Sequence, residues 1–294
     1  QIIGLLEEAK ESGEAKGIIT EKSRFYRTFA NKVYSENTLD FGIIIFFVDV
    51  TEEIQSEQIR RHFPANVSHE LKTPLTTIKG FGELLENGIF TKEEDVKKYG
   101  GMIYRESERL LYLINDIIRL SQIEEQEHVL SDKIDLLKTA HDVEEILRHK
   151  ADNREVTMTV EGEPVRIYGN QSYITELFLN LMDNAIKYNR EGGSLKVTVG
   201  AEDGKAVAVF SDTGIGISDE HQSRIFERFY RVDKSRSKQT GGTGLGLSIV
   251  KHIVAYHSGE IQLESELEKG TTITVKLPFN EPETQRAEET AVTE

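Results

Sequence analysis

The amino-acid sequence predicts an α+β multidomain protein in which a helical hairpin precedes an α/β sandwich domain. Three observations support this fold class. The 294 residues are enough for two or three domains, at roughly 100–200 residues each. Residues 51–126 repeat apolar side chains at helical spacing, whereas residues 127–280 alternate helical and strand-like segments. Helices interspersed with antiparallel hairpins are typical of one sheet covered by helices.

The composition excludes several classes of protein. The chain has 36 Lys and Arg against 51 Asp and Glu, a formal net charge of -15, and no cysteine. Without cysteine there is no disulfide framework, thiol enzyme or Cys-based zinc site. The acidic excess argues against binding of nucleic acid, because phosphate recognition needs a basic face. Any phosphate site must therefore be a local cluster of basic residues on an otherwise acidic chain.

The apolar stretches are too short for a membrane-spanning helix. The longest, Phe41 to Val48, has eight residues, whereas a span needs about 20. We therefore expect no membrane contact by this segment itself. Gln1 follows no charged and apolar leader, so the chain is expected to be a cytoplasmic segment of a longer parent protein. An anchor in the cell membrane would have to lie in residues absent here.

Residues 1–50 mix a short helical pattern with three strand-like runs at 17–20, 24–28 and 42–50. The helical pattern places apolar side chains at Ile2, Leu5, Leu6 and Ala9. The segment is short for a domain, and we interpret it as the end of a larger sensory module.

Residues 51–126 predict a dimerising helical hairpin. One apolar stripe consists of Phe63, Val67, Leu71, Leu75 and Ile78, and a second, after about Lys92, of Ile103, Leu110, Leu113, Ile117 and Leu120. Asn87-Gly88 predicts the turn between the two helices. Two helices with single stripes bury them poorly alone, so we expect a four-helix bundle in a homodimer.

Residues 127–280 predict the sandwich domain. Helices are expected at 137–149, 172–188 and 246–256, and strands at 155–160, 165–168, 194–199, 206–211, 260–263 and 271–277. Residues 281–294 contain five Glu, one Arg and no aromatic residue. That composition predicts a disordered acidic tail.

Two common phosphate-binding loops are excluded. A Walker A loop needs Gly-Lys followed by Ser or Thr, but Ala206 follows Gly204-Lys205. A Rossmann loop needs the spacing G-x-G-x-x-G, but the third glycine of Gly242-Thr243-Gly244-Leu245-Gly246 comes one residue early.

Four other blocks follow one another in a fixed order. They are Asn180-Leu181-Met182-Asp183-Asn184-Ala185-Ile186-Lys187-Tyr188, Asp212-Thr213-Gly214-Ile215-Gly216-Ile217, Arg224-Ile225-Phe226-Glu227-Arg228-Phe229-Tyr230-Arg231 and Gly242-Thr243-Gly244-Leu245-Gly246-Leu247. Taken singly, each has an ordinary interpretation as a helix surface, a turn, a solvated face or a flexible linker. Because all four blocks occur in order, it is improbable that every one of them has only its ordinary interpretation.

The first block places two amides and an ammonium on one helix face, because Asn180, Asn184 and Lys187 are four and three residues apart. Amide oxygens suit a Mg²⁺ ion that already carries phosphate oxygens. The ammonium of Lys187 suits phosphate directly.

The other blocks complete a nucleotide site. Asp212 ends a strand and offers an acceptor to the exocyclic amine of adenine, while Gly214 and Gly216 let a flat base approach the backbone. The glycines of 242–246 precede a helix whose N-terminal N–H groups favour phosphate. Residues 221–240 hold six Arg and Lys against two Asp and Glu. The local charge is thus where a triphosphate needs it.

The order of the four blocks resembles the ATP-binding fold shared by sensor histidine kinases, type II topoisomerases, a heat-shock chaperone family and a mismatch-repair ATPase family. The resemblance implies ATP and Mg²⁺ as cofactors and a mobile lid between Asp212 and Leu245. It also implies that Asn184 is the Mg²⁺ ligand, with Asn180 and Lys187 beside it.

The same resemblance implies roles for the remaining positions. Tyr188 would lie near the base or ribose, Asp212 on the adenine amine, and Arg228 or Arg231 near the terminal phosphates. The implied cofactor-binding set is Asn180, Asn184, Lys187, Tyr188, Asp212, Gly214, Gly216, Arg228, Arg231, Gly242, Thr243, Gly244, Leu245 and Gly246.

The hairpin carries Asn66-Val67-Ser68-His69-Glu70-Leu71-Lys72-Thr73-Pro74-Leu75. A zinc-protease motif would need a second histidine where Thr73 stands, so zinc is excluded. At about 100° per residue, His69 falls outside the apolar stripe, unlike an ordinary core histidine. Neutral imidazole is a nucleophile near pH 7, and Glu70 can take one ring proton while the other nitrogen attacks a γ-phosphoryl group. Alone, His69 and Glu70 would be an ordinary surface pair; upstream of the nucleotide blocks they favour phosphoryl transfer.

This hairpin motif followed by the four blocks resembles a two-component sensor histidine kinase over residues 51–279. The resemblance implies that His69 is autophosphorylated and passes its phosphoryl group to an aspartate on the receiver domain of a response regulator. His-Glu-x-x-Thr variants of that family often also dephosphorylate the regulator. We predict that Glu70 supports attack by His69, and that Thr73 positions the water that attacks the phospho-aspartate.

Residues 41–54, with Asp49-Val50-Thr51-Glu52 after a strand, are similar to the exit of a PAS sensory domain. The domain prediction is therefore a partial PAS-like segment at 1–50, the dimerisation and phosphotransfer hairpin at 51–126, the catalytic ATP-binding domain at 127–280 and the tail at 281–294.

Two other functions are weighed against the kinase. An ATP-driven clamp of the topoisomerase or chaperone kind would hydrolyse nucleotide to close a dimer, and would leave no phosphate on the chain. A degenerate scaffold would bind ATP without chemistry and would be expected to lack His69, Asn184, Asp212 or the glycines. All of these are present.

Overall fold

The computed structural model describes residues 2–22, 24–34, 41–89, 92–125, 130–232 and 242–279. The chain divides into two compact units, residues 1–70 and 71–294, and each is described by itself. The tail predicted at 281–294 and residues 233–241 of the predicted lid lie outside the described residues.

The first unit begins with a helix on a three-stranded antiparallel sheet. Helix α1 (Ile2–Ser12) is followed by β1 (Glu14–Glu21), β2 (Arg24–Tyr34) and β3 (Phe41–Asp49), in the order β1-β2-β3. The strands are longer than the sequence predicted, because polar residues continue the ladder beyond the apolar runs. Its small core consists of Ala9, Ala15 and Ala30, with Leu5, Ile43 and Ile45 packed against it.

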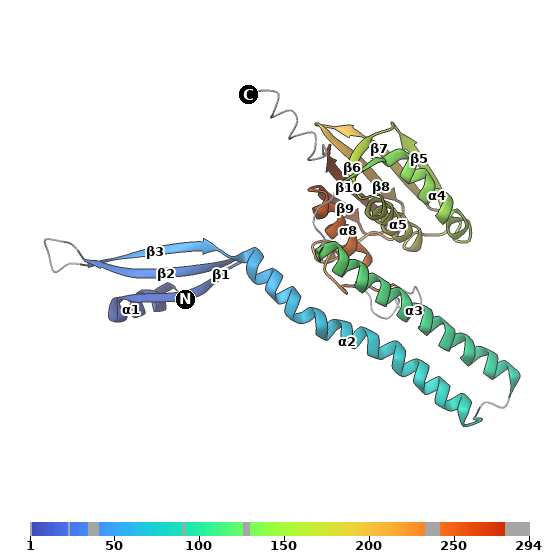
Figure 1. Cartoon of the computed structure of the whole chain (residues 1–294), viewed down its shortest axis with the longest axis horizontal. Coiled ribbons are helices and arrows are strands. Elements are labelled where there is room, and N and C mark those ends of the chain that lie inside the picture. The colour runs from blue at the N-terminus through green and yellow to red at the C-terminus, as the bar shows by residue number, and fades with distance from the viewer. Residues whose placement is uncertain are drawn as a thin grey trace. The chain divides into compact units, whose positions relative to one another are not determined.

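Two long helices follow the sheet, α2 (Thr51–Glu86) and α3 (Glu93–Glu125), as the hairpin prediction requires (Figure 1). The turn at Asn87-Gly88 lies where it was predicted, and Gly88 adopts a φ of 65°, which glycine tolerates. The residues of the predicted stripe on α2 differ in burial within one protomer. Leu75 is 57% exposed, whereas its neighbour Pro74 is buried. A single protomer therefore does not bury the whole predicted stripe.

The sandwich domain contains a five-stranded sheet with helices on one face (Figure 1). Its strand order is β5-β7-β8-β10-β9, with β5 and β7 parallel and the other pairs antiparallel. The strands are β5 (Thr157–Gly162), β7 (Ser194–Glu202), β8 (Lys205–Asp212), β9 (Glu260–Glu266) and β10 (Gly270–Pro278). The covering helices are α4 (Leu136–Asp152), α5 (Gln171–Lys187) and α8 (Gly246–Tyr256).

Three shorter elements complete this domain. Strands β4 (Asp132–Asp135) and β6 (Arg166–Gly169) form a separate antiparallel pair, and α6 (Asp219–Gln222) lies beside β9. The sequence did not predict β4 or α6, because each has only four residues and shows no clear period.

Helix α5 connects the core to the site. The Asn170 side chain caps it by accepting the Tyr173 N–H at 3.2 Å. Its apolar face is buried, and Phe178 packs edge-on against Phe210 of β8, with 5.1 Å between ring centroids. The opposite, polar face therefore has a fixed position, and this face carries Asn180, Asn184 and Lys187 of the first block.

Candidate active site

The end of α5 and the glycine block meet at Gly242. A methyl group added at Gly242 would lie 2.6 Å from Lys187 Nζ, 3.8 Å from the Tyr188 hydroxyl and 3.9 Å from an Arg231 guanidinium nitrogen. Lys187 Nζ also lies 5.2 Å from the centre of the Tyr188 ring. Residues from the first, third and fourth blocks are therefore gathered at one point.

The electrostatics at this point favour an anion. The pKa of Lys187 is lowered from 10.5 to about 8, chiefly by burial; Asp183 opposes the shift, and the neighbouring charges of Arg231, Lys150 and Arg154 add to it. Half-buried positive groups that repel one another gain stability from a bound anion. The Tyr188 hydroxyl has a raised pKa, chiefly because it is desolvated.

The second block lies against the end of α5. Asp212 Oδ1 accepts the Gly214 N–H at 2.7 Å and the Thr271 N–H at 3.3 Å. A methyl group at Gly214 would lie 2.5 Å from the Tyr188 carbonyl oxygen, so only glycine fits there. Burial raises the pKa of Asp212 despite those two hydrogen bonds.

The glycine block connects back to α5 and to the third block. A methyl group at Gly246 would lie 2.7 Å from Asn180 Oδ1. Gly244 has a φ of 77°, and its carbonyl accepts the Phe229 N–H at 2.9 Å. Helix α8 begins at Gly246 without a side-chain cap at Leu245. Its first N–H groups therefore remain available for phosphate oxygens.

The two arginines of the third block point to different places. Arg231 lies near Gly242 and Lys187, whereas Arg228 pairs with Glu124 of α3 and lies 3.2 Å from His252 Nε2 of α8. The sequence left both arginines open as phosphate ligands. The structure brings only Arg231 to the cluster at Gly242.

The predicted phosphoacceptor lies on α2. The His69 side chain is 82% exposed, and its Nδ1 lies 3.9 Å from Glu70 Oε1. The imidazole is thus accessible and adjacent to a carboxylate, as its position outside the apolar stripe predicted. Thr73 is exposed on the same helix, and its carbonyl accepts the Thr77 hydroxyl at 3.2 Å.

Comparison with known proteins assigns the two parts of the chain. Residues 59–126 match the "His Kinase A (phospho-acceptor) domain" family, and residues 169–281 match the "Histidine kinase-, DNA gyrase B-, and HSP90-like ATPase" family. The chain is 33% identical to the sensor protein SrrB of Staphylococcus aureus over 239 residues, 81% of this chain and 41% of SrrB. It is 35% identical to the sensor histidine kinase WalK of Bacillus subtilis over 256 residues, 82% of this chain and 40% of WalK. The chain belongs to the sensor histidine kinases.

The solved structures agree with this assignment. The histidine kinase ThkA, in complex with the response regulator protein TrrA, matches with a TM-score of 0.61 and 26% identity, over 96% of this chain and 84% of that one. This sensor histidine kinase chain spans about 40% of the length of the curated relatives it matches.

Five residues beside the four blocks were not singled out from the sequence. Asp116 accepts the Thr243 hydroxyl at 2.6 Å, and Arg119 Nε donates to Glu176 Oε2 at 2.5 Å. The other two are Glu124 and His252, which contact Arg228. Asp116 carried a detectable signal, because it is an acid three positions after Leu113 and four before Leu120 and therefore lies beside the apolar stripe of α3. The others carry no signal without the fold.

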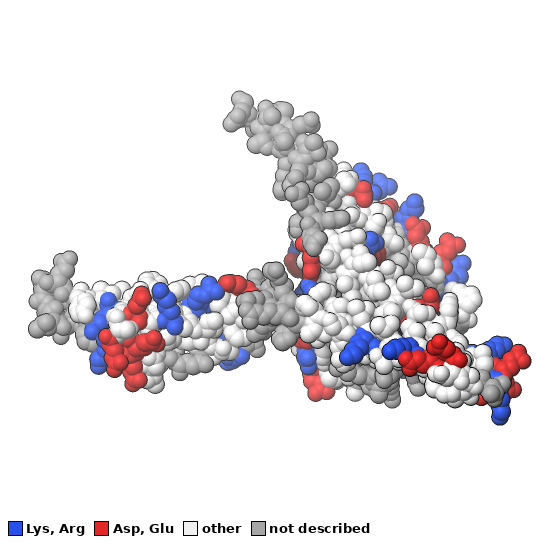
Figure 2. Space-filling view, turned by 60° about the horizontal axis from the view of Figure 1, so that its bottom comes forward, with Lys and Arg blue, Asp and Glu red and all other residues white. Residues whose placement is uncertain are grey.

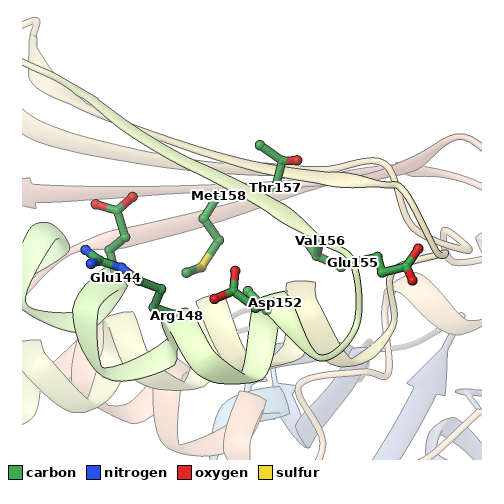
Figure 3. A pocket seen from close by; sticks show the side chains of 8 residues that line it. Glu144, Arg148, Asp152, Glu155, Val156, Thr157 and Met158 are labelled. Atoms are coloured by element: carbon green, nitrogen blue, oxygen red, sulfur yellow. The ribbon is translucent and has the colours of Figure 1, made fainter.

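A hollow of about 440 Å³ lies between the end of α4 and the start of β5 (Figure 3). Glu144, Arg148 and Asp152 project into it from α4, beside Met158 of β5. It contains no residue of the four blocks, so it is separate from the cluster at Gly242.

Three further findings concern charge, hydropathy and metal ligands. On the face drawn in Figure 2, basic and acidic side chains are interspersed. Among the described residues, no helix is both long and apolar enough to cross a membrane, and no group of three or more His, Asp or Glu side chains is arranged to hold a metal ion.

Proposed function

We propose that this chain catalyses ATP-dependent autophosphorylation of His69 and transfers the phosphoryl group to an aspartate on a response regulator. One observation carries the proposal. Lys187, Tyr188 and Arg231 converge on Gly242 beside the uncapped start of α8, in a chain that also presents the exposed His69-Glu70 pair. The first arrangement fits a nucleoside triphosphate, and the second fits the acceptor of its phosphoryl group.

The chemistry follows from the acceptor. One imidazole nitrogen of His69 attacks the γ-phosphorus, the bond from that phosphorus to the bridging oxygen breaks, and ADP leaves. Glu70 takes the proton from the other ring nitrogen and so stabilises the positive charge that develops on the ring. Phosphoryl transfer needs positioning and charge neutralisation more than covalent help, and Lys187 and Arg231 are placed to supply the charge.

The residues fit ATP and Mg²⁺. A methyl group at Gly242 or Gly246 would fill the space between the loop and α5, so both glycines leave a cradle open to the phosphates. Asn184 is half-buried one turn before Tyr188 on α5, and its amide oxygen would hold the ion. The ion, when bound, neutralises the phosphate oxygens and polarises the γ-phosphoryl group. Asp212 would accept the adenine amine.

We further propose a homodimer built from the hairpin. Leu111, Ile114 and Ile118 of α3 and Leu75 of α2 are exposed in the protomer. The three α3 residues are three and four positions apart and share one helix face. A second hairpin packed on these side chains would form the four-helix bundle and cover them.

Several narrower assignments are parts of the same proposal. The partner would be a receiver domain, as ThkA's complex with TrrA suggests by analogy. Regulator phosphatase activity would depend on Thr73. Residues 1–50 would be the end of a PAS-like sensory domain, with the hairpin at 51–126 and the catalytic domain at 127–280. The segment would be cytoplasmic, and any membrane anchor would lie elsewhere in the parent protein.

Incubation with γ-³²P-labelled ATP and Mg²⁺ tests the proposal. We expect label on His69 that is stable to base and labile to acid, and none in His69→Gln. Asn184→Ala should reduce labelling at least about tenfold, since disturbed metal sites typically lose 10–100-fold, while alanine keeps the helix. Release of labelled inorganic phosphate without label on the chain would instead support the clamp ATPase.

A further inference from the structure

Helix α3 contacts the nucleotide-binding domain through two acidic side chains. Asp116 Oδ2 accepts the Thr243 hydroxyl at 2.6 Å. Glu124 pairs with Arg228, and its Oε1 lies 2.9 Å from His252 Nε2. Thr243 and Arg228 belong to the fourth and third blocks. Both acids therefore act on loops that form the nucleotide site.

An apolar seam holds these acids in place. Leu113, Leu120 and Ile123 of α3 are buried, and α3 packs against α8. Asp116 and Glu124 lie on the same side of the helix, since they are three positions after Leu113 and four after Leu120. Burial raises the pKa of Asp116, although its bond to Thr243 lowers it. A half-buried acid in an apolar seam is unfavourable unless it is hydrogen-bonded, so the bond to Thr243 compensates for its presence there.

The bond to Asp116 occupies Thr243. A hydroxyl has a single hydrogen to donate. While that hydrogen goes to Asp116, the Thr243 oxygen can only accept, and it accepts the Leu245 N–H at 3.2 Å. Thr243 cannot then donate to a phosphate oxygen.

Glu124 occupies Arg228 as Asp116 occupies Thr243. The backbone carbonyl of Ser248 lies 2.7 Å from His252 Nδ1, so this nitrogen carries a hydrogen, and Nε2 faces both Glu124 and Arg228. The guanidinium of Arg228 is thereby held on α8 and α3, whereas Arg231 lies at the Gly242 cluster.

We propose that Asp116 and Glu124 form a latch that competes with the triphosphate of the nucleotide for Thr243 and Arg228, so that docking of α3 opposes binding of ATP. The inference rests on the proposed function, which places phosphates at this loop. Linkage then requires that ATP weaken the docking of α3 by the same factor as the docking weakens ATP. A displacement of α3 would change the nucleotide affinity.

Nucleotide binding by variants of the full chain tests the latch. The probe is the β,γ-imido analogue of ATP with Mg²⁺, measured by calorimetry. The latch variant, Asp116→Ala combined with Glu124→Gln, should bind the analogue at least about fivefold more tightly than the wild type does. A factor of that size is an ordinary allosteric coupling. The affinity of Asp116→Asn should fall between those of the wild type and the latch variant, because its uncharged amide oxygen still accepts a hydrogen bond from Thr243. Glu94→Gln, an exposed acid in the first turn of α3, is the matched control and should bind as the wild type does.

A distance measurement tests the reciprocal effect. The chain has no cysteine, so Gln122→Cys on α3 and Lys251→Cys on α8, both exposed, give one spin-label pair. We expect a single short distance without nucleotide, a longer and broader distribution with the analogue, and that broader distribution in the latch variant even without nucleotide.

The outcomes separate the latch from the proposed function. Equal or weaker binding by the latch variant, or a distance that nucleotide does not change, overturns the latch and leaves the nucleotide site standing. Absence of binding in the wild type and in every variant overturns the proposed function, and the latch with it.

Discussion

The imidazole of His257 accepts a hydrogen bond from the backbone N–H of Asn170 at 3.1 Å. His257 is fully buried at the end of α8, and its Nδ1 lies 2.8 Å from the Ile253 carbonyl oxygen. A carbonyl cannot donate, so Nδ1 carries the hydrogen and Nε2 is the acceptor. Asn170 in turn caps α5. A histidine to which the sequence assigned no chemistry thus fixes the start of the helix that bears Asn180, Asn184 and Lys187.

His257→Phe should therefore destabilise the catalytic domain. The ring would keep roughly its volume, but the half-buried Asn170 N–H would lose its acceptor, which costs about 1–3 kcal/mol. Urea denaturation measures the change. His257→Gln, whose side-chain oxygen can replace Nε2, is the control and should recover part of the loss. Equal stability of wild type and His257→Phe would show that the bond contributes nothing.

Asp212→Asn should weaken ATP binding about tenfold or more, because a hydrogen bond to a charged acceptor is worth about 1.5–3 kcal/mol. The Asn oxygen can keep the Gly214 and Thr271 N–H bonds that Asp212 Oδ1 makes. Its amide nitrogen would then face the adenine amine. Calorimetry with ATP and GTP checks both effects, since that nitrogen can donate to the guanine carbonyl and should narrow the preference for ATP. Unchanged ATP affinity would remove Asp212 from the base site.

The pKa of Lys187 predicts a pH dependence of nucleotide binding. In the nucleotide-free protein Lys187 loses its proton as the pH rises through about 8, because burial lowers its pKa from 10.5. Bound phosphate favours the charged form, so binding takes up a proton above that pH, and affinity should fall by up to about tenfold per pH unit. Titrations at pH 7 and pH 9, in buffers of different ionisation enthalpy, measure the affinity and the proton uptake. Lys187→Met should bind weakly with no such dependence.

The same residue affects stability with a defined sign. Between pH 8 and 10.5 the unfolded chain holds the Lys187 proton more firmly than the folded chain does. The contribution of Lys187 to the free energy of unfolding therefore rises with pH across this window. Below about pH 8 the full penalty for burying the charged group applies. Lys187→Met should flatten this part of the stability profile, and an unchanged profile would mean that Lys187 does not titrate there.

The elements that bear the site were predictable because their apolar patterns repeat over long segments. The sequence predicts helices at 172–188 and 246–256, and the structure has α5 at Gln171–Lys187 and α8 at Gly246–Tyr256. Both present apolar side chains at helical spacing over three turns or more. Strand β4 was not predictable, since Ile134 is its only buried residue.

The partners of the site residues were harder to predict than its elements. Arg228 and Arg231 are equivalent in sequence, but Phe229 between them has a φ of 63°, a left-handed conformation that the sequence does not predict. Arg228 pairs with Glu124, whereas Arg231 lies at Gly242. The bond from Thr243 to Asp116 joins residues 127 positions apart. Such contacts depend on the packing of α3 against α8, which no local pattern encodes.

The last prediction separates two activities on α2. Glu70 is adjacent to His69, with Oε1 3.9 Å from Nδ1, and its side chain is 29% exposed. It is placed to take the ring proton when His69 attacks ATP. Thr73 lies four positions after His69, one turn along the helix and on the same face. In the proposed phosphotransfer, a regulator aspartate approaches this face to receive the phosphoryl group from His69, and we expect the Thr73 hydroxyl then to orient a water toward the phospho-aspartate.

Thr73→Ala should leave autophosphorylation within about twofold and reduce regulator dephosphorylation at least about tenfold, a typical contribution of a group that positions a reactant. Glu70→Ala should do the reverse. Label transfer from ³²P-ATP measures the first activity, and loss of label from a purified phospho-regulator measures the second.

Thr76→Ala is the matched control, because the Thr76 hydroxyl donates a hydrogen bond to the Lys72 carbonyl of the same helix at 2.7 Å. Its loss should change neither activity beyond a small effect of helix stability. If Thr73→Ala lowers both activities equally, Thr73 acts as Thr76 does, through the backbone of α2, and the division of roles with Glu70 is wrong. If it lowers dephosphorylation alone, the hydroxyl acts on the regulator, because a weakened helix would also displace His69 and slow its own phosphorylation.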